Sequence, residues 1–478
     1  MKTKPTTLAA AAALLLLAGC SLQEPYQRPD AVRAAYPSGA AYAPDDSNGK
    51  VAAADTGWAE FLGDPALRQL VRLALDNNRD LRVAMLRVEQ ARAQLQLQRA
   101  ASLPQVNLAA NGSNSKNNSA SSSDASRNHG VTHNQSVGLS SSWELDLFGR
   151  LGSLNEVARE QYLSTDYARQ AAQLALVAQV SEQYLAMLAY GEQLAVSNET
   201  ARAAQESLRI VKLRFDTGTG SELDATLAQG TLQQAQANQA ALTRQQAQAR
   251  NALELLLGQA MPADLPPATP LRQLAFLADI PAGLPSELLL RRPDVQQAEA
   301  QLRAENARIG AARAAFFPRI ALTATAGTAS SSLGNLFQAG SGAWSFAPQL
   351  LLPLFDGGAN RANLDAARVA KDIGVAQYQK SVQVAFREVA DGLAARGTYE
   401  SELAARQAYS ETQQRRLALA ELRYDNGVDD YLSVLNAKTD LYNAQIALVT
   451  ARLNRWNSLL ELYRALGGGW REHGASPS

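Results

Sequence analysis

One stretch, from Ala359 to Tyr424, constrains the fold more than any other part of the chain. It contains no proline, and residues of high helix propensity (Ala, Gln, Arg, Glu and Leu) dominate it. As one helix it has about 66 residues and a length of about 100 Å at 1.5 Å per residue. A helix of this length is typical of a coiled coil, a helical repeat or a membrane span. The span is excluded because charged residues occupy the first turns: Arg361, Asp365, Arg368, Lys371 and Asp372.

A turn and a returning helix follow this stretch. Asn426 and Gly427 accept a left-handed backbone, so they end the helix at Tyr424. Helix-forming residues resume at Asp430 and run to Leu466, before three consecutive glycines. The sequence therefore predicts a very long helical hairpin whose tip is Gly427.

The chain carries this unit twice. Asp80 and Asp294 begin segments that match at a constant spacing of 214 residues, through Pro104 and Pro318. The first hairpin tip matches the second at a spacing of 209 residues, with Leu213-Arg214-Phe215-Asp216-Thr217-Gly218 aligned to Leu422-Arg423-Tyr424-Asp425-Asn426-Gly427. The sequence thus predicts two copies of one unit of about 200 residues.

Each copy is predicted to contain a helix, a strand pair, a long helix and a returning helix. In chain order the helices are Ala66 to Ser102, Gly152 to Phe215, Ser221 to Leu257, Ser286 to Phe316, Ala359 to Tyr424 and Asp430 to Leu466. In the first copy the two shorter helices total about 110 Å, and the long helix is about 96 Å. Stacked end to end, the shorter pair would match the long helix, as a wall of even height requires.

The long helix of the first copy has two stripes at heptad spacing. One consists of Leu174, Val177, Ser181, Tyr184, Leu188, Gly191 and Ala195, and the other of Leu176, Val180, Gln183, Met187, Tyr190 and Leu194. The stripes lie about 110° apart around the helix. A helix in a cylinder wall has two neighbours and needs two stripes, and a helix buried in a bundle is the alternative interpretation.

The segments between the helices alternate apolar and small or polar residues. One face consists of Val137, Leu139, Ser141, Trp143, Leu145 and Leu147 in the first copy, and of Trp344, Phe346, Pro348, Leu350 and Leu352 in the second. Val106 to Ala110 and Ile320 to Ala324 supply the partner strands. Strands of about ten residues with one apolar face are typical of transmembrane barrels, in which Trp143 and Trp344 suit interfacial girdles. The polar connections, Gly112 to Gln135 and Gly327 to Gly342, suit exposed loops.

Four strands per chain cannot close a barrel. Open strand edges are not tolerated in lipid, and closed bacterial barrels begin at about eight strands. The chain is therefore expected to assemble with copies of itself. Two, three or four copies would supply eight, twelve or sixteen strands, and strand counting does not choose among them.

The N-terminus is typical of a bacterial lipoprotein signal. Lys2 and Lys4 precede a short apolar run, which ends at Cys20, the only cysteine of the chain. We expect lipidation at Cys20, and the resemblance to lipoprotein signals implies that Ser21, rather than Asp, at the next position favours sorting to the outer membrane. The predicted boundaries are 1–19 for the signal peptide, 20–65 for a lipidated extended segment, 66–261 for the first repeat, 262–285 for a Pro-rich linker, 286–470 for the second repeat and 471–478 for the C-terminal tail.

Composition excludes several classes of function. Lys and Arg total 45, as do Asp and Glu, so no basic excess indicates nucleic acid. No catalytic set and no phosphate-binding loop is apparent, so we do not predict an enzyme. His129 and His133 lie in a Ser/Asn-rich loop and are interpreted as exposed rather than as metal ligands. We expect no metal site and no cofactor.

Four motifs resemble the outer-membrane channels of tripartite efflux pumps, the TolC family, in its OprM-like lipoprotein branch. The motifs are Trp143-Glu144-Leu145-Asp146-Leu147-Phe148-Gly149-Arg150, Leu284-Pro285-Ser286-Glu287-Leu288-Leu289-Leu290-Arg291-Arg292-Pro293-Asp294, Gly310-Ala311-Ala312-Arg313-Ala314-Ala315-Phe316-Phe317-Pro318-Arg319 and Arg464-Ala465-Leu466-Gly467-Gly468-Gly469-Trp470. With the signal around Cys20, the resemblance covers nearly the whole chain.

The resemblance implies a mainly α fold with a membrane β-barrel. Three copies would form a twelve-stranded barrel in the outer membrane and a periplasmic barrel of helical hairpins. It also implies a periplasmic adaptor protein and an inner-membrane, proton-driven transporter of the RND type as partners, with drugs, solvents or other small toxic compounds as cargo. A metal-ion efflux channel is the main alternative, and a periplasmic adaptor lipoprotein is a weaker one.

The resemblance further implies a periplasmic gate at the hairpin tips. The positions that match the family's links between tyrosine and charged residues are Tyr424 and Asp224. Leu432 and Asn436 lie four residues apart, on one helix face, and three copies would form an apolar ring beside a polar ring. The family often has Asp at the position of Asn436. Asp429 and Asp430 lie nearby and complete the predicted gate.

Overall fold

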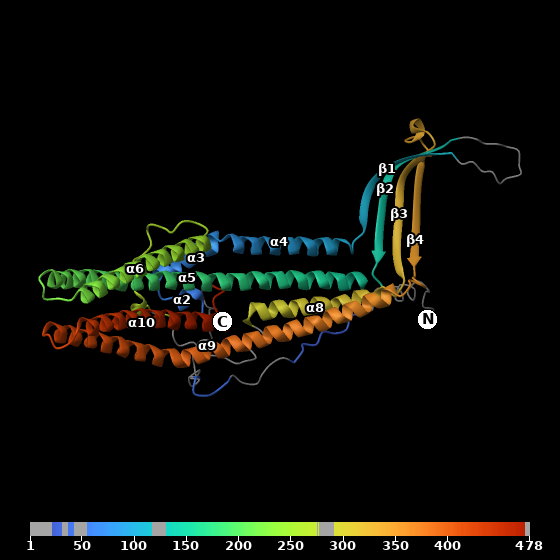
Figure 1. Cartoon of the computed structure of the whole chain (residues 1–478). Coiled ribbons are helices and arrows are strands. Elements are labelled where there is room, and N and C mark those ends of the chain that lie inside the picture. Colours follow the sequence, from blue (N-terminus) through green and yellow to red (C-terminus); the bar gives the residue numbers. More distant parts are fainter. Residues whose placement is uncertain are drawn as a thin grey trace. The chain divides into compact units, whose positions relative to one another are not determined.

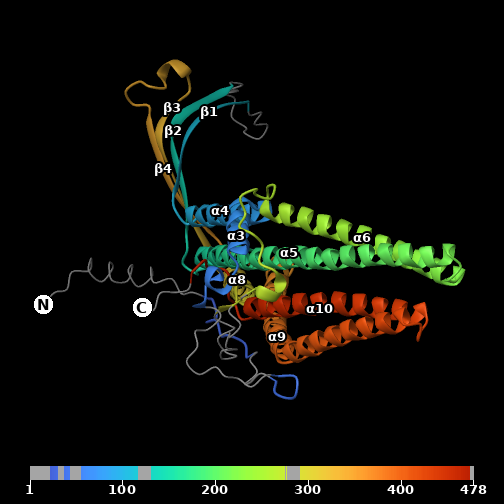
Figure 2. The same ribbon diagram turned by 90° about the vertical axis from the view of Figure 1, so that its left-hand side faces the viewer.

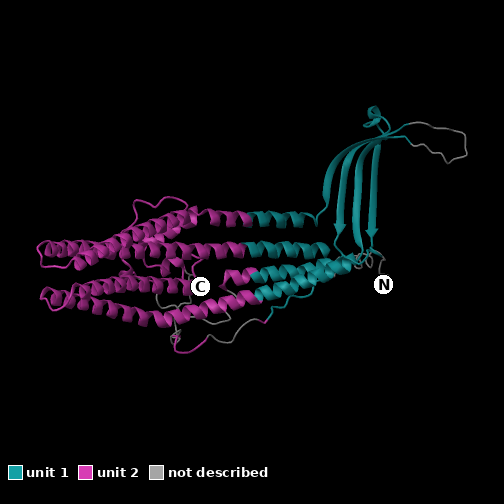
Figure 3. Cartoon of the chain, viewed as in Figure 1, with its two compact units in different colours: residues 1–29, 88–165, 298–378 teal, residues 30–87, 166–297, 379–478 magenta. Residues whose placement is uncertain are grey.

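The computed structural model describes residues 22–30, 37–42, 55–116, 131–274, 276 and 291–473. Cys20 lies outside these residues, as does His129. The chain divides into two compact units, which are coloured in Figure 3. Unit one contains residues 1–29, 88–165 and 298–378, and unit two contains 30–87, 166–297 and 379–478.

Unit one contains a four-stranded antiparallel sheet in the order β1-β2-β3-β4, and the strands lie side by side in Figures 1 and 2. The strands are β1 (Gln105–Ser115), β2 (Thr132–Leu145), β3 (Arg319–Ser330) and β4 (Gly342–Leu351). They extend further than predicted, because residues 112–115, 132–135 and 327–330 are paired rather than looped. The pairing joins backbone groups, so Ser and Asn side chains do not prevent its continuation.

The predicted alternation persists across the whole sheet. Leu108 lies opposite Leu139, which lies opposite Ala326, which lies opposite Trp344. Neighbouring strands therefore present their apolar residues on one face, because paired residues point to the same side. Trp143 lies near the end of β2, whereas Trp344 lies opposite Ala326 and therefore in the row of Leu139, at the middle of β2. The two tryptophans are thus four residues apart along the sheet.

Parts of four helices complete unit one: α4 (Arg79–Ala100), α5 (Arg150–Asp216), α8 (Pro293–Ala314) and α9 (Ala359–Asp425). Small residues allow α5 and α8 to pack closely, with Val157 of α5 buried against Ala304 and Ala307 of α8. The Glu299 carboxylate accepts two hydrogen bonds of 2.9 Å from the Arg28 guanidinium. This ion pair holds the extended segment 22–29 on α8.

Unit two contains the remaining parts of α5 and α9, with α6 (Glu222–Leu257) and α10 (Tyr431–Ala465) as returning helices. It also holds two short helices, α2 (Trp58–Phe61) and α3 (Pro65–Asn77), and a 3-10 turn, η2 (Leu271–Gln273). The four hairpin helices agree with the predicted ranges to within two residues. None of the described helices has a stretch long and apolar enough to cross a membrane.

The single helix predicted over Ala66 to Ser102 is wrong, because Asn78 separates α3 from α4. Asn78 has an extended backbone, with ψ of 128°. Its side chain accepts a hydrogen bond from the Leu81 amide, and this caps α4. The same side chain donates to the Leu256 carbonyl at 2.9 Å, so it also binds the last turn of α6.

Arg292 occupies the corresponding position of the second repeat. Its guanidinium donates to the Ala465 carbonyl at 3.0 Å, as Asn78 does to Leu256, and also binds Asp294 and Glu388. In both repeats, therefore, the side chain at this position donates to a carbonyl in the last turn of the returning helix. The donor is an amide in the first repeat and a guanidinium in the second. The predicted helix start at Ser286 falls outside the described residues, and α8 begins at Pro293, where its missing N–H costs no helical hydrogen bond.

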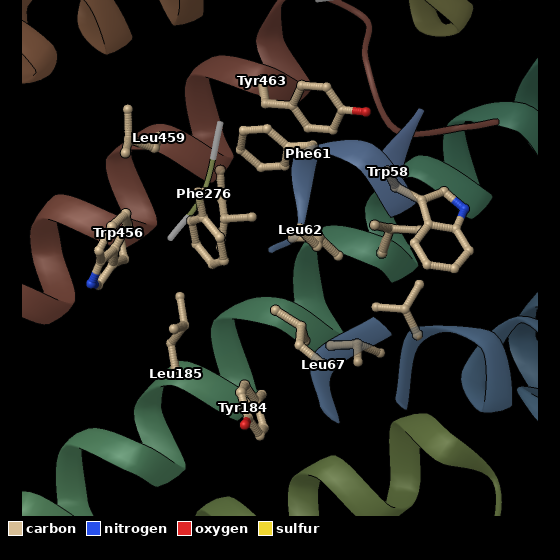
Figure 4. Close-up of a cluster of buried hydrophobic side chains, with 14 of the residues drawn as sticks. Trp58, Phe61, Leu62, Leu67, Tyr184, Leu185, Phe276, Trp456, Leu459 and Tyr463 are labelled. Carbon is tan, nitrogen blue, oxygen red and sulfur yellow. The ribbon is translucent and has the colours of Figure 1, made fainter. Parts of the chain in front are cut away.

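An aromatic core joins distant segments within unit two (Figure 4). Phe61 stacks on Tyr463 with ring centroids 4.0 Å apart, and Phe276 meets Trp456 edge-on at 4.9 Å. The Trp456 indole donates to the Leu271 carbonyl at 3.0 Å. The segment predicted as extended, 20–65, therefore contains the helix α2, because burial of Trp58 and Phe61 stabilises it.

Of the thirteen residues in the two stripes of α5, six are buried and six are half-buried. Leu174, Val177, Ser181 and Tyr184 of the first stripe are at most 8% exposed, as are Leu176 and Val180 of the second. Ala195, the last member of the first stripe, is exposed. The helix therefore has neighbours on two sides, as a wall helix requires.

Candidate functional site at the hairpin tips

Both hairpin tips end in the same turn. Gly218 and Gly427 have left-handed backbones, with φ of 76° and 69°. In the second tip the Gly427 amide donates to the Tyr424 carbonyl at 2.9 Å, and the Val428 amide donates to the Arg423 carbonyl at 2.9 Å. This pair of bonds ends a helix with a glycine, whose left-handed conformation carries no Cβ penalty.

The two tips of one chain share a small apolar cluster. Val211 of α5, Ala228 of α6, and Tyr431 and Val434 of α10 are buried against one another. Burial raises the pKa of the Tyr431 phenol, and the nearby charge of Asp224 adds to this effect. The cluster links the first hairpin to the second near their ends.

A polar layer surrounds this cluster. The Arg214 guanidinium lies 5.0 Å from the centre of the Tyr424 ring and 3.5 Å from the Asp425 carboxylate. Both partners belong to the second hairpin, so Arg214 connects the two tips by a cation–π contact and an ion pair. Lys438 of α10 adds a second connection, since its ammonium donates to the Ser207 hydroxyl of α5 at 2.6 Å.

The repeat explains why Arg214 reaches across. Its counterpart Arg423 binds Asp429 of its own hairpin through two hydrogen bonds of 2.6 and 2.8 Å, which lower the pKa of Asp429. The position that corresponds to Asp429 in the first repeat is Gly220, which has no side chain. Arg214 therefore lacks a partner at that place in its own hairpin, and it binds Asp425 of the other.

The predicted site residues lie in this region in different environments. Leu432 is 47% exposed, and Asn436, one turn later, is also exposed. Asp430 caps α10 by accepting a hydrogen bond of 3.0 Å from the Ser433 amide. Tyr424 meets Arg214 rather than Asp224, which lies in the first turn of α6.

Five residues of the polar contacts at the tips were not among the predicted site residues: Ser207, Arg214, Arg423, Asp425 and Lys438. The two arginines belong to the repeated tip motif, so the repeat was the signal that could have identified them. Arg214 binds a residue of the other hairpin and Arg423 binds one of its own hairpin. Sequence spacing does not show this difference in partners.

Within the residues that the structure describes, no group of three or more His, Cys, Asp or Glu side chains could hold a metal ion. His133 lies beside Asn114, with its Nδ1 atom 2.6 Å from the amide oxygen. The hairpin tips therefore remain the candidate site in the described part of the chain.

Comparison with known proteins relates this architecture to one family. The family model described as outer membrane efflux protein matches residues 70–259 and 284–468. The toluene efflux pump outer membrane protein TtgI of Pseudomonas putida is 48% identical over 460 residues, which cover 96% of this chain and 97% of TtgI. The outer membrane protein OprJ of Pseudomonas aeruginosa is 45% identical over 460 residues, which cover 96% of this chain and 95% of OprJ.

Solved structures agree with this relationship. The open state of the MtrE outer membrane channel of Neisseria gonorrhoeae superposes with a TM-score of 0.85 at 36% identity, over 96% of this chain and 100% of MtrE. The predicted fold class and outer-membrane location are confirmed. The two repeats, the paired strands and the long hairpins thus have one explanation: this chain belongs to the outer membrane efflux protein family.

Proposed function

We propose that this outer membrane efflux channel is the exit duct of a tripartite multidrug pump, for drugs, solvents or other small toxic compounds. The similarity to a toluene efflux pump protein over 96% of the chain is the observation that carries the proposal. Aromatic solvents and many antibiotics are apolar, and a duct for them needs little chemical recognition. Choice of cargo then belongs to the transporter that supplies the duct.

The proposed assembly is a homotrimer anchored at Cys20 and embedded in outer-membrane lipid. Three copies of the four-stranded sheet would supply twelve strands, within the range of closed bacterial barrels. The proposed partners are a periplasmic adaptor protein and an inner-membrane transporter of the RND type. We assign the chain no catalytic activity, no cofactor and no nucleic-acid partner, and we keep 66–261 and 286–470 as the two repeats.

The proposed gate consists of the hairpin tips. Leu432 and Asn436 present exposed side chains on one face of α10, and three copies would form two rings around the pore axis. Tyr424 supports the tips through Arg214, Asp429 through Arg423, and Asp430 as the cap of α10. Asp224 adds a negative charge near Tyr431. Asn436 carries no charge, so this ring is polar but neutral.

The test is complementation of a Gram-negative strain that lacks its own outer-membrane efflux channel. The strain would express the chain together with the adaptor and transporter of a toluene pump such as that of TtgI. We expect survival in toluene and lower accumulation of a fluorescent pump substrate, compared with an empty vector. A chain that reaches the outer membrane and forms trimers, yet restores neither property, would refute the proposal.

Two alternative functions, a periplasmic adaptor and a metal-ion channel, were considered in the sequence analysis. Membership of the outer membrane efflux protein family excludes the adaptor interpretation. No observation in the described residues favours a metal-ion duct over one for organic compounds. The same complementation strain, challenged with copper and silver salts, separates these two cargo classes.

A further inference from the structure

A groove opens in unit one where α5, α8 and α9 meet the ends of the strands. Its volume is about 940 Å³, and its walls come from the first turns of α5 and α9, the last turns of α8, the start of β3 and the end of β4. All of these segments belong to unit one, which is teal in Figure 3. A volume of this size is within the range of sites for small organic ligands.

Most of the groove wall is apolar. Leu154 and Val157 of α5 contribute to it, together with alanines of α8 and α9 that include Ala312, Ala366 and Ala370. Alanine side chains are short, so they leave room for a hydrocarbon chain that lies along the helices. Burial of such a chain against methyl groups removes apolar surface from water and is favourable.

Three guanidinium groups line the same groove: those of Arg150, Arg308 and Arg319. Glu144, which does not line it, accepts hydrogen bonds of 2.9 and 2.8 Å from Arg150 and one of 3.3 Å from Arg319. One carboxylate thus serves two guanidiniums. Arg308 has no hydrogen-bond partner among the described residues, and its Nε lies 3.6 Å from the Glu305 carboxylate. Guanidinium N–H groups therefore remain available at the groove.

Asp356 is the carboxylate among the lining residues. It accepts hydrogen bonds from the backbone amides of Gly358, at 2.9 Å, and Asn360, at 2.8 Å. These bonds satisfy the carboxylate within the first turn of α9. The charged groups left for a ligand are the guanidiniums, whose N–H groups bind carboxylate, sulfate or phosphate.

The groove lies on the face of α8 that is turned away from the extended segment 22–29. The Asn306 side chain donates to the Glu24 carbonyl at 2.9 Å, so Asn306 marks the face under that segment. At 100° per residue, Arg308 and Ala315 lie about 180 to 200° around the helix from Asn306. In the proposed trimer the segment leads to the lipid anchor and lies outside the duct. The groove on the opposite face therefore faces the inside.

We propose that this groove binds an anionic amphiphile with a single hydrocarbon chain on its passage through the duct. The anionic head lies at Arg308 and Arg150, and the chain lies along the alanine wall. This inference rests on the proposed function and deepens it, because it names a class of cargo that the duct itself retains. A lipid of the surrounding membrane has similar chemistry, but it meets the outer face of the duct rather than this one.

Photolabelling of the full chain in outer membranes tests the site. The probe is dodecanoate with a diazirine at the end of its chain, which forms a covalent adduct with neighbouring groups on irradiation. We expect adducts in the tryptic peptides 309–313 and 362–368, which carry alanines of the groove wall. Excess dodecanoate should suppress this labelling. Dodecyltrimethylammonium, which has the same chain and the opposite charge, should not.

Two variants alter the groove at exposed positions, so neither disturbs the packed core. Arg308→Gln removes a positive charge from a side chain that is 47% exposed. The dodecanoate concentration that halves labelling of peptide 362–368 should rise about tenfold, as expected for loss of one charge-assisted hydrogen bond. Ala366→Glu places a carboxylate in the groove and repels the anionic head. It should raise the corresponding concentration for peptide 309–313 at least as much.

Arg159→Gln is the matched control. Arg159 pairs with a glutamate three residues earlier, as Arg308 does, and its side chain is 53% exposed, but it does not line the groove. The control should leave the concentration unchanged. Equal suppression by dodecyltrimethylammonium, or the same shift in Arg159→Gln, would overturn the proposal. Adducts confined to peptides of the strands would show contact with membrane lipid only and would also overturn it.

The outcomes separate this inference from the proposed function, because labelling does not require efflux. A chain that restores efflux without labelling that dodecanoate suppresses refutes the groove alone. A chain that shows such labelling but restores no efflux refutes the proposed function, and the groove then stands as a binding site.

Discussion

Arg214 offers the sharpest test of the gate, because it joins the two hairpin tips of one chain. Its guanidinium faces Tyr424 at 5.0 Å and Asp425 at 3.5 Å. Movement of one tip away from the other must break both interactions. We therefore expect Arg214→Ala to favour a wider entrance.

The magnitude follows from the two contacts. An exposed cation–π contact contributes about 0.5 to 1 kcal/mol. An ion pair whose side chains are 38% and 67% exposed, as here, lies in the range of about 0.2 to 1 kcal/mol. Loss of about 1 kcal/mol per chain changes the ratio of open to closed tips about fivefold. If three tips open together, the change is about 3 kcal/mol, or about 100-fold.

Single-channel recording in planar bilayers measures this ratio as the fraction of time in the wider state. We expect a large increase for Arg214→Ala and a partial reversal in Arg214→Asp/Asp425→Arg, which restores the ion pair. Arg202→Ala is the matched control, because Arg202 pairs with Glu199 on its own helix. An unchanged open fraction at normal trimer yield, or an equal effect of Arg202→Ala, would refute the role of Arg214.

The remaining predictions concern the rings, the core and the anchor. Leu432→Ala should raise conductance and sensitise cells to large antibiotics, and unchanged conductance would place the Leu432 side chain away from the pore. Asn436→Asp should strengthen block by divalent cations, since three carboxylates on one axis attract a counter-ion. Unchanged block would place the side chain of residue 436 away from the pore. Arg292→Ala should cost about 1 to 3 kcal/mol, because it leaves the buried Ala465 carbonyl without its donor. A thermal shift no larger than that of an exposed ion-pair variant would contradict this. Burial raises the pKa of Glu160, so ionisation of its carboxyl destabilises the folded state and stability falls as the pH rises through that pKa. Glu160→Gln should therefore raise the melting temperature at pH 8 and have no such effect at pH 4. Cys20→Ser should abolish incorporation of labelled palmitate, and persistent labelling would refute the anchor.

The amino-acid sequence by itself determined the repeat, the long hairpins and the two-faced strands. Each depends on local properties: helix propensity, a period of 3.6 or 2 residues, and glycine at the tips. For this reason α9 was predicted from Ala359 to Tyr424 and observed from Ala359 to Asp425. The repeat spacing was equally readable, because corresponding residues stand at constant intervals.

Tertiary structure decided what local pattern does not contain. Asn78 ends one helix and begins another because its side chain reaches the end of α6, a partner 178 residues away. Phe61 and Tyr463 stack although they lie at opposite ends of the chain, and this burial turns an apparently extended segment into a helix. Arg214 and Arg423 occupy equivalent positions, yet one binds across the hairpins and the other within its own. The absent side chain of Gly220 produces that difference, and it takes effect only when the folded tips bring Asp425 within reach.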